Sequence, residues 1–207
     1  MDKLKGILFA ALSAATFGLI PLYANQAILD GVNNETILVY RYGIAGVLYA
    51  IYLLFRGTNM RLSRGELQEV TIAGVGGYGI TAFFLMWSYH YMPTGVATAI
   101  HFFYPVVVAL LMAIFYKERL PLAVRAGIVL AICGVYLLSW TPGEVKWMGL
   151  FFVLMSTLTY GCYITALNRP VLKRINPDVL TCYVLLFTAL FYLIVAVARG
   201  KMEIITR

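Results

Sequence analysis

The sequence predicts an all-α, polytopic membrane protein with seven transmembrane helices on an inverted five-plus-five repeat plan. Three observations predict it: the composition, the spacing of the apolar stretches and an internal repeat. Hydrophobic residues make up 62% of the 207 residues, and charged residues only 12%. A water-soluble domain is about 45–50% apolar, and one core of this size could not bury the excess. Lipid is therefore the expected solvent.

Seven apolar stretches are long enough to cross a bilayer core of about 30 Å, which needs roughly 20 helical residues. They are Leu4–Leu29, Thr36–Phe55, Val70–Tyr91, Gly95–Tyr116, Ala123–Trp140, Trp147–Leu167 and Val179–Ala198. Turn-forming residues such as Asp30-Gly31, Thr141-Pro142-Gly143 and Asn176-Pro177 separate them. Helices are expected because a backbone in lipid must satisfy its own hydrogen bonds. The first stretch is not read as a signal peptide, because it runs on to Leu29 and recurs later.

The distribution of basic residues predicts the orientation. With the N-terminus in the cytoplasm, eleven lysines and arginines fall on inside segments and four on outside segments, and Arg41 lies within a span. This bias is typical of a multi-pass protein of the cell (inner) membrane with a cytoplasmic N-terminus. The net charge of +7 does not indicate nucleic-acid binding, because the basic residues sit in short gaps between apolar runs.

An internal repeat is the most informative feature. Gly6–Gly57 aligns with Gly149–Gly200 without a gap, at an offset of 143 residues. Identical pairs include Gly6/Gly149, Ser13/Ser156, Thr16/Thr159, Gly18/Gly161, Asn33/Asn176, Arg56/Arg199 and Gly57/Gly200. Five predicted spans separate the two starts, and an odd number inverts the second copy in the membrane. We therefore expect a first repeat at residues 1–141 and an incomplete second repeat at 142–207.

Three ordered stretches resemble the EamA-type transporters of the drug/metabolite transporter superfamily, which have ten helices in two five-helix repeats. The opening carries Gly18, Pro21 and Arg41, and Ser88–Leu120 carries Pro105 and Glu118-Arg119-Leu120. Gly127–Leu138 is similar to the family's fifth helix. The resemblance implies a transporter of a small organic solute or metabolite, usually for efflux, that alternates access between inverted repeats. The chain departs from the family's pattern in stopping after seven helices.

Candidate site residues are few. No nucleophile–base pair, phosphate-binding loop or metal-ligand cluster is present, so the sequence predicts neither an enzyme nor a cofactor or metal site. Cys133, Cys162 and Cys182 lie inside apolar runs without disulfide or metal-ligand spacing. The candidate substrate-binding residues are Arg41, Trp87, Thr98, His101, Tyr104, Tyr160 and Tyr163.

Each candidate has a functional and a structural interpretation. Arg41 is a counter-charge for an anionic substrate group, or an arginine whose side chain reaches the membrane interface. His101 shares a helix face with Thr98 and lies near Pro105. It is either a titratable residue in the wall of a binding pocket or a histidine whose hydrogen bonds are supplied by a neighbouring helix. The aromatic residues form a cage or populate the interface. We expect Arg41, His101, Tyr104 and Tyr160 to border one polar cavity between the halves.

Alternatives to a transporter remain. A retinal protein needs a lysine in the seventh span for its Schiff base, and Val179–Ala198 contains none. An inactive or scaffold-like membrane fragment stays open. The expected partners are a small-molecule solute and the lipid bilayer. A homodimer is the alternative in which a naturally short chain completes the transporter with a second copy of itself. If the transporter is incomplete, the sixth and seventh spans should expose polar or small-residue faces meant for other helices.

Overall fold

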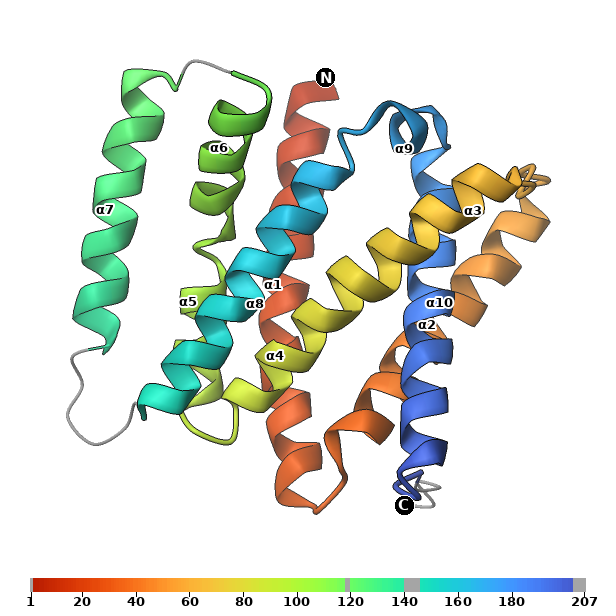
Figure 1. Ribbon diagram of the computed structural model, residues 1–207, viewed down its shortest axis with the longest axis horizontal. Helices are drawn as coiled ribbons and strands as arrows, with labels where there is room; N and C mark the ends of the chain where they lie inside the picture. Colours follow the sequence, from red (N-terminus) through yellow and green to blue (C-terminus); the bar gives the residue numbers. More distant parts are fainter. Residues whose placement is uncertain (1, 118–119, 140–145, 203–207) are drawn as a thin grey trace.

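The computed structural model describes residues 2–117, 120–139 and 146–202, and every regular element in these ranges is a helix (Figure 1). The elements are α1 (Asp2–Leu29), α2 (Asn34–Phe55), α3 (Arg64–Thr71), η1 (Ile72–Gly79), α4 (Ile80–Ser88), α5 (Thr94–His101), α6 (Tyr104–Phe115), α7 (Leu122–Ser139), α8 (Trp147–Ala166), α9 (Pro170–Arg174) and α10 (Pro177–Ala198). The expected all-helical class is confirmed for these residues. Glu118, Arg119, residues 140–143 and Arg207 lie outside the described ranges.

Within the described ranges, six segments are long and apolar enough to cross a membrane. They are Leu4–Leu29, Asn34–Phe55, Arg64–Ser88, Thr94–Phe115, Trp147–Ala166 and Pro177–Ala198. They correspond to the predicted spans one to four, six and seven. The predicted fifth span corresponds to α7, whose described apolar stretch, Leu122–Gly134, is shorter. The multi-pass helical class is thus supported, and the number of seven spans stays a prediction.

The third span changes its helical form in the middle. Between α3 and α4 it passes through η1, eight residues with the wider turn of a π-helix. Such stretches are rare and frequently mark functional positions. A Cβ atom on Gly77 would lie 2.9 Å from the Cβ of Tyr163, and one on Gly74 would lie 3.2 Å from the Cα of Val184. Close packing therefore explains these two glycines.

The fourth span consists of two helices. The first, α5, ends at His101, and α6 begins at Tyr104. Pro105 lies in the first turn of α6, where its missing N–H removes no helical hydrogen bond. The sequence predicted one continuous span that is loosened at Pro105, whereas the structure has an interruption at Phe102 and Phe103.

Equivalent helices of the two copies run in opposite directions. In Figure 1, α1 descends while α8 ascends, and α2 ascends while α10 descends to the C-terminal end of the described chain. The main packing partners of α8 are α4, α5 and α6, and those of α10 are α2 and η1. The larger buried core brings together Leu38, Met86, Ile100, Val153 and Tyr192 from five helices.

The ends of α2 and α10 have the same geometry. Both helices are 22 residues long, and their first and last residues fall in the register of the repeat. Asn33 and Asn176 each cap a helix with the side-chain oxygen. The C-terminal ends close with a glycine at positive φ, 64° at Gly57 and 62° at Gly200.

Small residues of the two copies differ in what they contact. On α8, a Cβ on Gly161 would lie 2.5 Å from Cγ1 of Val107, and one on Gly149 would lie 2.9 Å from the Cβ of Tyr91. On α1, the equivalent Gly18 and Gly6 have no such neighbour within 4 Å among the described residues. The expectation that the sixth span leaves its small residues open is therefore wrong. These glycines are covered by the segments of spans three and four, and the open positions lie on α1.

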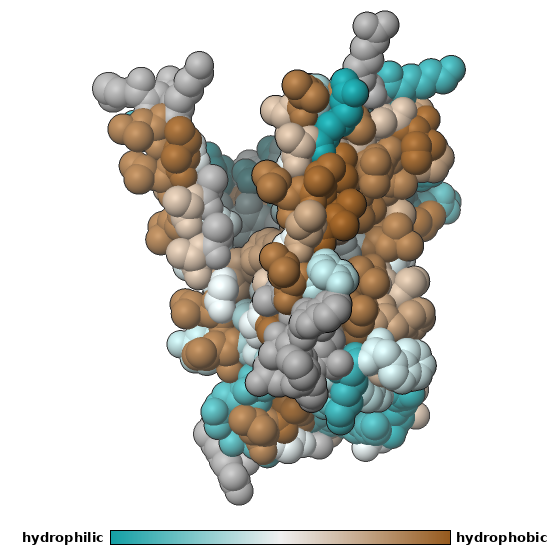
Figure 2. Space-filling view, turned by 90° about the vertical axis from the view of Figure 1, so that its left-hand side faces the viewer, coloured by the Kyte–Doolittle hydropathy of each residue, from teal (hydrophilic) through white to brown (hydrophobic). Residues whose placement is uncertain are grey.

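Apolar side chains dominate the outer surface. Figure 2 shows them over the middle of the molecule, with hydrophilic residues gathered toward its two ends. On α1 alone, Leu4, Ile7, Leu8, Phe9 and Leu12 are each more than 60% exposed. Lipid is the solvent that makes such a surface favourable.

Candidate functional site

Arg41 lies within α2 and faces the interior of the bundle. Its Cζ atom is 5.1 Å from the centre of the Tyr42 ring, which places the cation over an aromatic face. Among the described residues, the ion pairs are Arg169–Glu69 and Arg199–Glu35, and neither includes Arg41. A charge at membrane depth without a carboxylate partner is costly and is typical of a functional position.

His101 is the last residue of α5 and is only 2% exposed. Its Nδ1 atom lies 2.9 Å from the hydroxyl oxygen of Ser156 on α8. Its ring also contacts Tyr160 and Tyr104, at centroid distances of 5.3 and 5.9 Å. A neighbouring helix therefore satisfies His101, as the structural interpretation expected, and the same ring forms part of the aromatic wall beside Arg41.

A cluster of tyrosines surrounds this wall. Tyr78, in η1, contacts Tyr42 at 5.4 Å, Tyr163 at 5.5 Å and Tyr160 at 6.3 Å between ring centres. Tyr160 and Tyr104 meet edge to face at 4.6 Å. Such rings combine an apolar face with a polar hydroxyl group, so they suit a solute with both kinds of surface.

Two adjacent cavities share Arg41 and Met86. The smaller, of about 30 Å³, is lined by Phe17, Arg41, Tyr42, Tyr78, Thr81, Ala82, Leu85, Met86, His101 and Tyr160. The larger, of about 360 Å³, is lined by Thr16, Leu19, Ile20, Tyr23, Ala24, Ile37, Arg41 and Met86. The smaller has room for about one water molecule. The larger falls within the usual range for small-molecule sites, roughly 300–1,000 Å³.

Polar contacts hold the irregular third span against its neighbours. Thr188 and Tyr192 of α10 donate hydrogen bonds of 3.1 and 2.6 Å to the carbonyl oxygens of Gly74 and Gly79. Thr81 of α4 donates to the hydroxyl oxygen of Thr159 on α8 at 2.9 Å. Backbone that departs from the α-helix is tolerated at membrane depth where protein satisfies it.

The predicted site residues divide into three groups. Arg41, His101 and Tyr160 line the same small cavity, and Tyr104 contacts two of them without lining it. Tyr163 packs on Tyr78 and lines a separate cavity of about 380 Å³ between η1 and α8. Their roles in binding stay predictions.

Trp87 and Thr98 lie away from the small cavity. Trp87 lines a cavity at the Asp30–Glu35 end, and its buried indole N–H has no hydrogen-bond partner among the described residues. Thr98 donates to the carbonyl oxygen of Thr94 at 2.7 Å and lies 3.2 Å from the hydroxyl of Tyr89. A cage of aromatic residues around one cavity is not formed, because each of the four candidates lines a different cavity: Tyr23, Trp87, Tyr160 and Tyr163.

Sequence analysis missed Tyr42, Tyr78 and Ser156. Each lies in a helix that is apolar on most faces, so periodicity alone does not distinguish inward from outward positions. A usable signal existed for Ser156, because it is one of the identical pairs of the repeat with Ser13. For Tyr78, the signal that could have been used is its place as an aromatic residue among Gly74, Gly76, Gly77 and Gly79.

Comparison with known proteins finds relatives that are named as transporters. A protein of Archaeoglobus fulgidus named as an uncharacterized transporter is 30% identical over 141 residues, which are 68% of this chain and 49% of the relative. A protein of Streptantibioticus cattleyicolor named as a probable terminal-alkyne amino-acid exporter is 27% identical over 166 residues, 80% of this chain and 55% of the relative. The chain thus spans about half the length of these curated relatives. No solved structure matches the chain.

The family assignment rests on the first five predicted spans. The EamA-like transporter family matches residues 4–140, which include Arg41, Trp87, His101 and Tyr104. Together with the six apolar helices, this match covers most of the chain. The protein belongs to the EamA-like transporter family.

Proposed function

We propose that this chain forms part of a membrane transporter for small organic solutes that carry an anionic group beside an apolar body. The observation that carries the proposal is Arg41, a cation without a carboxylate partner among the described residues, placed where two cavities meet. Its guanidinium provides the counter-charge, and donors of this kind bind carboxylates in a bidentate geometry. The apolar lining of the larger cavity receives the body of the solute.

The two sequence repeats support alternating access as the mechanism. The equivalent helices α2 and α10 run antiparallel and have matching caps, as expected for copies inverted in the membrane. Arg41 and Tyr42 come from the first copy, and Tyr160 and Tyr192 from the second. The candidate site therefore lies between the copies, where such transporters bind their solutes. The exporter name of the Streptantibioticus relative favours outward movement.

Solute flux through reconstituted protein tests the proposal. Leucine, leucinamide and 4-methylpentanoate form a matched probe set, because leucinamide lacks the carboxylate and 4-methylpentanoate lacks the amine. We expect vesicles containing the protein to move both carboxylates faster than leucinamide. Arg41→Gln should reduce that flux by roughly tenfold or more, because a hydrogen bond to a charged group contributes about 1.5–3 kcal/mol. Arg61→Gln, in an exposed loop, is the control and should leave the flux unchanged.

Two outcomes would reject the proposal. Correctly inserted protein that moves no member of the probe set would favour the inactive or scaffold-like fragment. Equal flux of leucine and leucinamide, unaffected by Arg41→Gln, would reject the role of Arg41 as counter-charge.

We infer further that additional helices complete the site beside α1. The face of α8 that carries Gly149 and Gly161 is covered by the segments around Tyr91 and Val107, whereas the equivalent face of α1 is open within the described part of the chain. Helices equivalent to α4 and α6 would cover it. They come from further spans of a longer protein or from a second copy of this chain. Oligomeric state and flux, measured together in vesicles, separate the two: flux from a defined dimer favours the second copy, and robust flux from a monomer rejects the inference.

A further inference from the structure

Two carboxylates stand at opposite ends of the antiparallel pair formed by α2 and α10. Glu35 lies in the first turn of α2 and Asp178 in the first turn of α10, and the register of the repeat makes them equivalent. Two equivalent arginines, Arg56 and Arg199, cap the other ends of the same helices. Each end of the pair therefore combines a carboxylate from one copy with an arginine from the other.

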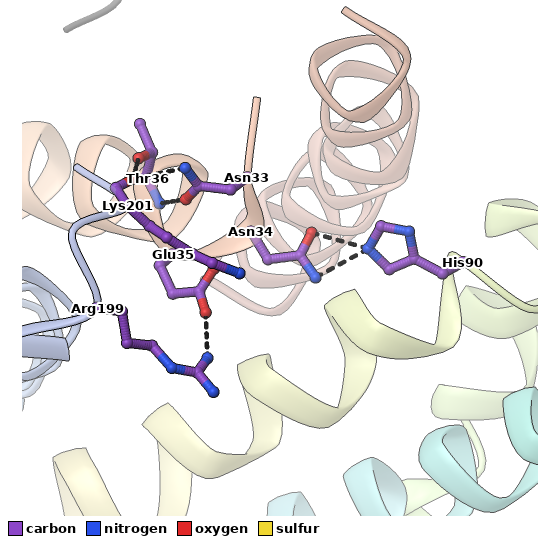
Figure 3. A network of polar contacts seen from close by, with 7 residues as sticks. All are labelled: Asn33, Asn34, Glu35, Thr36, His90, Arg199 and Lys201. Atoms are coloured by element: carbon purple, nitrogen blue, oxygen red, sulfur yellow. Dashed lines mark hydrogen bonds and ion pairs between the residues drawn. The ribbon is translucent and has the colours of Figure 1, made fainter. Parts of the chain in front are cut away.

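At the Glu35 end, direct bonds join the two copies (Figure 3). Arg199 Nη1 donates to Glu35 Oε1 at 2.7 Å, and the Glu35 side chain is only 7% exposed. Next to this ion pair, the side chains of Asn33 and Thr36 both donate to the carbonyl oxygen of Lys201, at 2.5 and 3.1 Å. These bonds join the start of α2 to the end of α10.

A further contact ties the same end to the third span. The side-chain amide of Asn34 lies 3.0 Å from Nε2 of His90, which follows α4. His90 is therefore part of a polar network rather than a residue held by solvent alone. Movement of the start of α2 away from α10 would break the contacts with Arg199 and Lys201 together.

The Asp178 end carries the same charged groups in a different pairing. Asp178 Oδ1 accepts a hydrogen bond of 2.8 Å from the hydroxyl of Tyr49. Arg56 Nη1 donates to the hydroxyl of Tyr52 on its own helix, at 3.1 Å. The counterpart of Tyr49 in the second copy is Tyr192, which donates to the Gly79 carbonyl and not to Glu35. One carboxylate thus binds an arginine and its equivalent binds a tyrosine.

We propose that Glu35–Arg199 and Asp178–Arg56 are the two gates of the transporter, and that they pair alternately. The inference rests on the proposed function, because inverted repeats change access by exchanging the conformations of equivalent elements. In the present structure Glu35 is paired with Arg199, which in this scheme is the closed form of that gate. In the opposite state Asp178 pairs with Arg56, and Glu35 is released to the hydroxyl of Tyr192.

The chemistry of the four groups suits such an exchange. An arginine–carboxylate bond is charge-assisted at both partners, so it is stronger than the bond of a neutral phenol to the same carboxylate. Only the end with the arginine pair is held firmly shut. The tyrosine supplies a donor at the other end, so that no carboxylate loses every partner when its arginine leaves.

The accessibility of the two adjacent cavities that share Arg41 and Met86 tests the gates without a measurement of flux. In a background with Cys133, Cys162 and Cys182 replaced, a Met86→Cys reporter lines both central cavities. We expect an impermeant maleimide applied from the Glu35 side to label the reporter slowly. Glu35→Gln or Arg199→Gln should increase that rate by about tenfold or more, as expected from the loss of a charged hydrogen bond. Arg56→Gln and Asp178→Asn should leave the rate unchanged or lower it.

Matched controls remove the same groups elsewhere. Glu69→Gln breaks an ion pair of 2.8 Å that does not join α2 to α10, and Lys146→Gln removes an exposed cation from the Glu35 side. Neither should change the labelling rate. The charge exchange Glu35→Arg with Arg199→Glu should restore slow labelling.

Disulfide cross-linking covers the case in which a charge variant fails to fold. The pair Glu35→Cys/Arg199→Cys should cross-link readily, and Arg56→Cys/Asp178→Cys should cross-link more once the first gate is disabled by Arg199→Gln. Equal labelling rates in all charge variants would contradict the proposed gates. Cross-linking at the Asp178 end that is the same with and without Arg199→Gln would contradict them too. If the protein moves no solute but the variants still differ in labelling and cross-linking, the proposed transport is rejected and the gates are not. If the protein moves solute but the variants do not differ, the gates are rejected and transport is not.

Discussion

Thr188 on α10 donates a hydrogen bond of 3.1 Å to the carbonyl oxygen of Gly74, inside the π-helical part of the third span. The Thr188 side chain is fully buried. A π-helical stretch is rare, and at membrane depth irregular backbone is tolerated where the surrounding protein supplies hydrogen-bond partners. The contact therefore stabilises the irregular backbone on which Tyr78 is presented to the candidate site.

Removing this donor should destabilise the fold. Thr188→Val keeps the shape of the side chain and leaves the Gly74 carbonyl oxygen without this partner, which costs about 1–3 kcal/mol. We expect a lower midpoint of thermal unfolding for the detergent-solubilised protein. Thr181→Val on the same helix is the control, because the Thr181 hydroxyl is exposed and donates within its own helix to Pro177. Equal changes in the unfolding midpoint of the two variants would show that the hydrogen bond between Thr188 and Gly74 does not contribute specifically to stability.

Equivalent glycines of the two repeats should respond differently to alanine. A Cβ at position 161 would lie 2.5 Å from Cγ1 and 2.9 Å from Cβ of Val107, and a valine cannot easily turn aside. Overpacking of this kind costs about 1–3 kcal/mol. At Gly18 the added methyl group meets nothing within 4 Å in the described part of the chain, and alanine favours the helix.

We therefore expect Gly161→Ala to lower the thermal unfolding midpoint of this chain and Gly18→Ala to leave it unchanged or raise it. Each variant is the control for the other, since they occupy the same position of the repeat. A loss of stability with Gly18→Ala would indicate that the face of α1 is already covered by another helix, for example in a dimer.

The positions of the helices could largely be predicted from the sequence, because length and hydropathy are what a bilayer selects. The predicted spans Thr36–Phe55 and Val179–Ala198 end at the same residues as α2 and α10, and begin two residues later than they do. The form of the third and fourth spans could not be predicted. Whether Ile72–Gly79 takes a π-helical turn depends on donors such as Thr188 from a helix more than a hundred residues away.

The candidate site could be predicted only where a residue type is rare in lipid. Arg41 and His101 stood out because charged and titratable groups are costly in a span. Tyr42 and Tyr78 did not, since tyrosine is common at membrane interfaces and no residue pattern gave its depth. Trp87 and Thr98 were predicted to belong to the site from their residue type and their spacing in the sequence. The packing of α4 and α5 instead turns them away from the small cavity.

Orientation in the membrane is the last expectation and the one on which the direction of transport depends. The eleven-to-four distribution of basic residues predicts a cytoplasmic N-terminus. Asn34, in the loop expected outside, would be one position for a labelling experiment. However, it is only 7% exposed and its side chain contacts His90. Asp30 and Arg61 are exposed at opposite ends of the bundle and are the better pair.

Single cysteines at these two positions, in a background free of the three native thiols, should react oppositely with an impermeant maleimide applied to intact cells. We expect Asp30→Cys to be labelled and Arg61→Cys to be protected, and both to react after the membrane is permeabilised. The reverse pattern would invert the topology and place the closed Glu35–Arg199 gate on the cytoplasmic side. Under the proposed gating scheme, the labelling result also determines on which face of the membrane the paired Glu35–Arg199 gate lies.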